Sequence, residues 1–79
     1  MTRVRVRLTF PDSLVRAPVV ARLVSDFAVV PDIRRADVGA ESGWIICELD
    51  GAATALDAGI AWLRAEGVTV DLLGDVLES

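Results

Sequence analysis

A short charged segment carries the side chains best suited to binding a ligand. Within the stretch "VVPDIRRADV", residues 29–38, the charged residues are Asp32, Arg34, Arg35 and Asp37. An ionised carboxylate only accepts hydrogen bonds, so Asp32 suits an ammonium group, whereas Arg34 or Arg35 offers the donor fork that fits a carboxylate. These side chains therefore fit a small group that carries both a positive and a negative charge, and Ile33 is the apolar residue among them.

A simpler interpretation of the same charges needs no ligand. Asp32 and Asp37 would then pair with Arg34 and Arg35 on an exposed surface. Such pairs typically contribute about 0–1 kcal/mol. Both interpretations stay open at the level of the sequence.

The elements that position this segment follow from hydrophobic periodicity. Strict alternation over "RVRVRLTF" predicts a half-buried strand, and apolar residues at helical spacing predict two helices. The expected ranges are strand 3–10, helix 18–27, strands 29–38 and 43–49, helix 52–66 and strand 68–73. This order predicts an α+β fold of the ferredoxin-like βαββαβ type, a two-layer sandwich in which two helices cover one face of a four-stranded antiparallel sheet.

Several local features refine these elements. In the first helix, we expect the core-facing residues to be Val20, Leu23, Val24 and Phe27. Pro18 suits the first position of that helix, and Gly67 suits the position just after the second helix. Pro31 predicts an edge strand that bulges or bends near that residue, and residues 39–43 predict a hairpin connection.

The sheet face opposite the helices is expected to mix cationic and apolar side chains. The candidate interface residues on it are Arg5, Arg7, Trp44 and Ile46. Tryptophan and arginine are enriched among the residues that dominate binding energy at interfaces. The alternative is that the arginines solvate this face and their alkyl stems partly cover Trp44.

Length and charge limit the possible partners. The chain has 79 residues, of which 53% are hydrophobic, which predicts one domain over residues 1–79 with a loosely ordered tail at 74–79. Its net charge of −4 argues against binding to nucleic acid, and it has no apolar run long enough to insert into a membrane. With the single cysteine, Cys47, these features predict a cytoplasmic protein.

Catalytic chemistry finds little support among the residue types. The chain contains no histidine, which removes the commonest general base and metal ligand. Neither a paired nucleophile and base nor a glycine-rich phosphate loop is found. We therefore expect no enzyme activity, no metal site and no cofactor.

Nearly the whole chain resembles the NIL domain, the C-terminal domain of the ATPase subunit of bacterial methionine importers. The similarity rests on the order and spacing of "RLTF", "APVVARLVSDF", "DIRRADV", "GWIICELDG" and "GIAWLRAEGVTVDLLG". The namesake Asn-Ile-Leu motif of that family falls on Asp32, Ile33 and Arg34, so this chain departs from it at the first and third positions.

The resemblance implies an ACT-like regulatory domain that forms a homodimer and binds methionine or a related amino acid. Its expected ligand-binding residues are Asp32, Ile33, Arg34 and Arg35. The alternative is a module that binds a protein partner in sulfur or methionine metabolism, without a small ligand.

Overall fold

The structure is a computed structural model that describes residues 2–11, 16–38 and 43–75. Along the chain the elements are β1 (Thr2–Phe10), α1 (Arg16–Phe27), β2 (Val30–Val38), β3 (Gly43–Gly51), α2 (Ala53–Ala65) and β4 (Thr69–Asp75). This is the βαββαβ order that the hydrophobic periodicity predicts.

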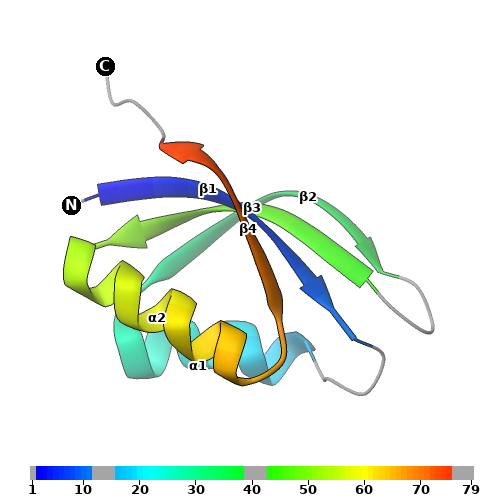
Figure 1. The fold of residues 1–79 in the computed structure, drawn as a ribbon, viewed down its shortest axis with the longest axis horizontal. Coiled ribbons are helices and arrows are strands. Elements are labelled where there is room, and N and C mark those ends of the chain that lie inside the picture. Colours follow the sequence, from blue (N-terminus) through cyan, green and yellow to red (C-terminus); the bar gives the residue numbers. More distant parts are fainter. Residues whose placement is uncertain (1, 12–15, 39–42, 76–79) are drawn as a thin grey trace.

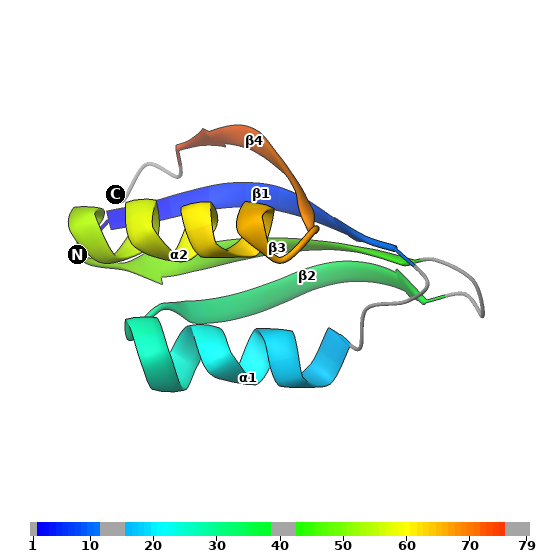
Figure 2. The same ribbon diagram turned by 60° about the horizontal axis from the view of Figure 1, so that its bottom comes forward.

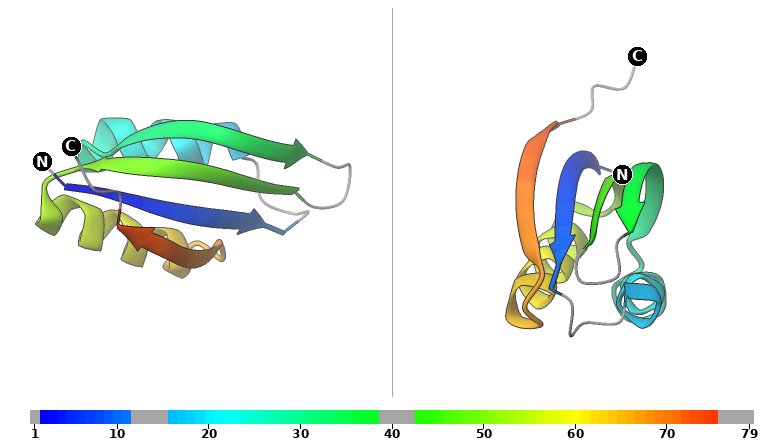
Figure 3. Two further views of the ribbon diagram at one scale, coloured as in Figure 1. Left: turned by 90° about the horizontal axis from the view of Figure 1, so that it is seen from above. Right: turned by 90° about the vertical axis from the view of Figure 1, so that its right-hand side faces the viewer.

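The strands form one antiparallel sheet in the order β2-β3-β1-β4. Both helices lie against the same face of this sheet, with α1 beneath the β2 edge and α2 nearer β4 (Figures 1 and 2). No helix of the described residues lies on the opposite face (Figure 3). The predicted ferredoxin-like two-layer sandwich is confirmed, and the uncovered face is open to a ligand or a partner.

Alternation along the central strands separates the core from the open face. On β1, Val6, Leu8 and Phe10 are buried beneath the helices, whereas the arginines between them face the other way. The remaining core comes from α1, β3, α2 and the approach to β4; its largest fully buried members are Leu23, Leu49, Leu63, Val29 and Cys47. One continuous apolar layer therefore joins the sheet to the helices.

The first helix differs from its prediction in two respects. It begins at Arg16, so Pro18 is its third residue rather than its first. The core-facing stripe is centred on Val19 and Leu23. The prediction that Val24 belongs to the core is wrong, because 48% of its surface is exposed. Since α1 lies at the edge of the sheet, only a narrow stripe of the helix faces the core.

The second helix ends as its glycine predicts. Gly67 has φ +97°, a left-handed conformation that a residue with a Cβ adopts at a cost. Its N–H donates to the carbonyl of Arg64, and the N–H of Val68 donates to that of Leu63. These two hydrogen bonds form the glycine-terminated cap that turns the chain from α2 into β4.

The last strand is longer than the sequence indicates. Gly74 and Asp75 pair with Arg5 and Val4 of β1, so residues placed in the predicted tail belong to β4. The rest of that tail, residues 76–79, lies outside the described residues, as do residues 39–42 of the hairpin connection predicted at 39–43. The last residue of that connection, Gly43, begins β3.

Candidate functional site

The register of the sheet decides which side chains meet on the open face. Arg5 of β1 lies opposite Glu48 of β3, and Asp32 of β2 lies opposite the same glutamate from the other side. Two residues before Glu48, on the same face of β3, Ile46 lies between Arg7 of β1 and Arg35 of β2. A carboxylate and an isoleucine on the third strand are thus bordered by charged side chains from its two neighbours.

A bulge in β2 places two consecutive arginines on this face. The register between β2 and β3 shifts between Ile33 and Arg35, which leaves Arg34 as an extra residue in the strand. The bulge is therefore at Arg34 and not near Pro31 as predicted. In a regular strand, adjacent side chains point to opposite faces, and a bulge relieves that restriction locally.

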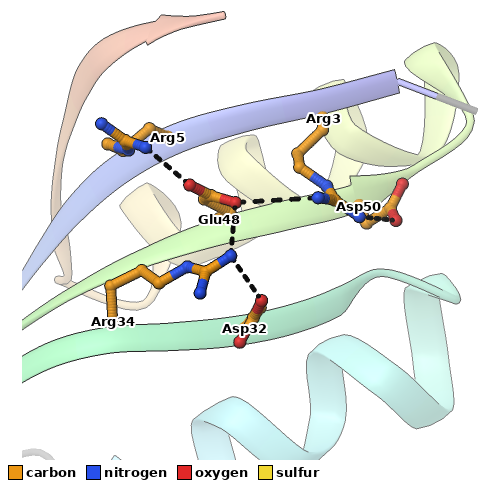
Figure 4. Close-up of polar contacts among 6 residues, drawn as sticks. All are labelled: Arg3, Arg5, Asp32, Arg34, Glu48 and Asp50. Atoms are coloured by element: carbon orange, nitrogen blue, oxygen red, sulfur yellow. Dashed lines mark hydrogen bonds and ion pairs between the residues drawn. The ribbon is translucent and has the colours of Figure 1, made fainter. Parts of the chain in front are cut away.

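Glu48 is the centre of an ion network that spans three strands. Its Oε2 accepts a hydrogen bond from Nη2 of Arg5 at 2.7 Å, and its Oε1 accepts one from Nη2 of Arg34 at 3.2 Å. The same Arg34 nitrogen lies 3.1 Å from Oδ2 of Asp32. Figure 4 shows Arg5 and Arg34 reaching Glu48 from opposite sides, so the network connects β1 and β2 across β3.

A further arginine extends the network toward the start of β1. Nη1 of Arg3 is 3.8 Å from Oε1 of Glu48, and its Nη2 donates to Asp50 at 3.1 Å (Figure 4). Three guanidinium groups thus surround one carboxylate. Charge-assisted hydrogen bonds of this kind are roughly twice as strong as neutral ones.

The arginine side chains, and not the hydrophobic core, cover Glu48. Only 3% of Glu48 is exposed, although it lies on the face without helices. The hydrogen bond from Arg5, with that from Arg34, holds the pKa of the Glu48 carboxyl below its ordinary value, and these contacts outweigh the opposing effect of its removal from water. Glu48 is therefore a fixed negative charge whose two oxygens are already occupied.

Beside the network the open face forms a shallow hollow with a volume of about 600 Å³. Its lining comes from all three strands that border the centre of this face and from β4: Arg5, Arg34, Arg35, Ile46, Glu48 and Leu73. Arg35 forms no ion pair or hydrogen bond with any residue in the described part of the chain. The hollow therefore combines an available guanidinium with an apolar floor.

The structure brings together some of the predicted site residues and separates others. Arg34 and Arg35 line the hollow with Arg5 and Ile46, which the sequence placed in an interface. Asp32 lies at its rim, against Arg34. Ile33 pairs with the core-facing Cys47, which directs it to the other face of the sheet, where 51% of its surface is exposed.

The two other interface candidates lie on the same face but outside the hollow. Arg7 approaches Asp71 of β4 at 3.5 Å, and both side chains are about half exposed. Trp44 is half-buried and lies opposite Thr9. The role of these residues in an interface stays a prediction.

Sequence reasoning gave no role to Glu48 and Leu73. The alternation of β3 does place Glu48 on the open face, and an acidic residue on a strand beside the arginines of β1 is a signal for a cross-strand ion pair. Leu73 gave no such signal. It lines the hollow because β4 also has a bulge. Arg5 of β1 pairs with Gly74 and Val6 pairs with Leu72, so Leu73 is the extra residue between them.

Two kinds of site are not found in the part of the chain that the structure describes. No group of histidine, cysteine and acidic residues is arranged to bind a metal ion among residues 2–11, 16–38 and 43–75. Within the same ranges no helix is both long and apolar enough to cross a membrane.

Comparison with known proteins identifies relatives of this fold. The model of the NIL domain matches residues 4–71. The C-terminal domain of an ABC transporter ATP-binding protein from Enterococcus faecalis superimposes with a TM-score of 0.77 at 23% identity, covering 90% of this chain and 83% of that one. No curated protein sequence matches this chain.

A second structure extends the comparison of folds. Prephenate dehydratase from Streptococcus mutans superimposes with a TM-score of 0.59 at 18% identity. The match covers 94% of this chain but 42% of the dehydratase, so it concerns less than half of that protein. At these identities the two solved structures support the fold alone.

Proposed function

Because this chain belongs to the NIL domain family, we propose that it is a regulatory domain that binds a small molecule and carries out no catalysis itself. The ligand in this proposal is an amino acid, and methionine and related sulfur-containing amino acids are the first candidates. The observation that carries the proposal is the hollow on the open face, with three arginines around an apolar floor.

The hollow has the chemistry that an amino acid requires. The carboxylate of the ligand binds to Arg35, which has no partner among the described residues, and to the remaining donors of Arg34. The ammonium group binds to Asp32 at the rim, whose side chain is 55% exposed. The side chain of the ligand packs on Ile46 and Leu73.

The occupied state of Glu48 supports this assignment of the ammonium group. Both oxygens of Glu48 already accept hydrogen bonds from arginines, whereas Asp32 makes one ion pair with the described residues, through Oδ2 to Arg34. A ligand ammonium that displaced an arginine from Glu48 would leave a guanidinium without its partner. Asp32 is therefore the acceptor that costs less to use.

Calorimetric titration with methionine, cysteine and homocysteine tests the proposal directly. We expect saturable binding that Arg35→Gln weakens by roughly tenfold or more, since one charge-assisted contact is lost. Arg7→Gln is the matched control, because Arg7 lies on the same face but outside the hollow. If none of these amino acids, nor any other tested, gives heat or a thermal shift, the proposal is wrong.

A second candidate function is docking of a protein partner, in sulfur or methionine metabolism or as a second copy of this chain. It is favoured by the half-buried Trp44 and Ile46 on a face that no helix covers. Sedimentation velocity across a concentration series measures self-association. A Trp44→Ala variant that keeps the same oligomeric state and the same partners would contradict this candidate.

A further inference from the structure

The arginines of the hollow lie on its two opposite sides. Arg5 belongs to β1, whereas Arg34 and Arg35 belong to β2, and β3 with Ile46 lies between these strands. Two interstrand spacings separate β1 from β2, about 10 Å between their backbones. Figure 4 shows the side chains of Arg5 and Arg34 converging from these two sides. Donors are thus available at both ends of a short apolar floor.

The charges of the lining are not balanced. Three guanidinium groups face one carboxylate, that of Glu48, whose oxygens are bound by Arg5 and Arg34. Asp32 at the rim offsets one more positive charge through its contact with Arg34. With Asp32 included, one positive charge remains in excess among the lining residues and Asp32. It corresponds to Arg35, which has no ion-pair partner in the described part of the chain.

A neutral amino acid leaves this arrangement incomplete. Its single carboxylate binds on the β2 side, and its ammonium group binds to Asp32. Nothing in such a ligand reaches the donors that Arg5 does not use for Glu48, because Arg5 directs only Nη2 to that carboxylate among the described contacts. The excess positive charge also stays uncompensated, since a zwitterion brings no net charge.

We propose that the hollow selects a small acid with two carboxylates on a short carbon chain, the chemical type of an acidic amino acid. One carboxylate binds to Arg34 and Arg35, and the second binds to Arg5 on the other side. The carbon chain lies over Ile46 and against Leu73. This inference rests on the proposed function, because it assigns a ligand class to the same hollow.

The same chemistry has two sources, a dicarboxylic amino acid and a dicarboxylic acid without an amino group. An acidic amino acid carries two carboxylates and one ammonium group. The site offers arginines on two sides and one acceptor at the rim, Asp32, whose Oδ2 contacts Arg34 and whose side chain is 55% exposed. Comparing glutamate with glutarate therefore separates the two sources. A preference for glutamate identifies an ammonium site, which Asp32→Asn should remove.

The test is calorimetry at one fixed ionic strength with glutamate, glutarate, methionine and butyrate. We expect glutamate or glutarate to bind at least about tenfold more tightly than methionine and butyrate, as one further charged contact provides. If methionine binds as tightly as both dicarboxylates, this inference is wrong while the proposed function stands. If none of the four ligands and none of the other amino acids binds, both are wrong.

Variants locate the second carboxylate. Arg5→Gln should weaken dicarboxylate binding by roughly tenfold and butyrate binding by much less, and Arg7→Gln should change neither. An Arg5→Gln variant that binds dicarboxylates as the parent protein does would overturn the assignment of Arg5.

A measurement on the unmodified protein avoids dependence on how Arg5→Gln folds. Raising the salt concentration should weaken dicarboxylate binding more steeply than butyrate binding, because the first ligand makes more ionic contacts. Equal salt dependence of the two ligands would overturn the inference.

Discussion

The two faces of the sheet are built from the same strands and use opposite chemistry. On the helix-covered face, β1 and β3 contribute Val6, Leu8, Cys47 and Leu49 to a continuous apolar core. On the open face, charged side chains form an ion network centred on Glu48, and a shallow hollow lies beside it. The continuous apolar core therefore lies on one face, and the residues with binding chemistry lie on the other.

The largest expected effect comes from removing a buried side chain from the helix-covered face. Leu23→Ala removes a fully buried side chain of α1 and should lower the free energy of unfolding by about 2–5 kcal/mol. Since small domains rarely have more than about 3–5 kcal/mol in total, this variant should be largely unfolded. Urea denaturation followed by tryptophan fluorescence measures the change.

The adjacent position supplies the control for that experiment. Val24 is on the same helix but is 48% exposed, so Val24→Ala should cost about 0.5 kcal/mol or less. Similar losses for Leu23→Ala and Val24→Ala would show that the helix buries a different stripe from the one described.

A second expected effect concerns the reactivity of Cys47, which reports how completely the helix-covered face excludes solvent. Burial, with the nearby carboxylate of Asp32, raises the pKa of the Cys47 thiol from 9.0 to about 11. Near pH 8 the thiolate fraction therefore falls by about a hundredfold, and thiol labelling should slow by at least that factor relative to the chain in urea. Labelling of the folded protein at a rate within a few-fold of the unfolded rate would contradict this burial.

The smallest of the three effects concerns the open face and depends on pH. The arginines lower the folded-state pKa of Glu48 from its ordinary 4.5, so the folded protein binds fewer protons than the unfolded chain near that pH. The stabilisation is present above 4.5 and is lost as the pH falls through the folded-state pKa. Glu48→Gln should remove this part of the pH dependence and cost less stability at pH 7 than Leu23→Ala.

Thermal unfolding between pH 7 and pH 3 measures this difference. Asp57→Asn is a suitable control, since Asp57 is an exposed carboxylate on α2, away from the ion network. If the stability of Glu48→Gln falls with pH as steeply as that of the parent protein and the Asp57→Asn control, the ion network does not contribute as described.

The same contrast explains which features could be predicted from the sequence. Alternation in β1 and helical spacing in α2 are local signals, and they were sufficient for the element order and the fold. Helical spacing predicts Val24 in the core of the protein. That prediction fails because spacing does not show that α1 lies at a sheet edge, where only part of the helix is covered. Local signals thus predict the elements but not how much of each one the neighbouring layer covers.

The candidate site depends on register, which no local signal reports. The sequence predicts Arg34 and Arg35 as binding residues, but only the pairing of β2 with β3 and of β3 with β1 brings them to the same hollow as Arg5. Glu48 was placed on the correct face and given no role, since its value comes from the arginines opposite it. Ile33 belongs to the same charged segment, but the regular alternation of β2 places it opposite the core-facing Cys47, on the other face from Asp32.

The bulge at Arg34 has a consequence for how the site can change. Because Arg34 is the extra residue, Ile33 still pairs with Cys47 before it and Arg35 still pairs with Ile46 after it. Deleting Arg34 would leave a regular strand in which every other side chain keeps its partner and its face. A single-codon deletion or insertion therefore adds or removes the guanidinium that contacts both Glu48 and Asp32 without repacking the core.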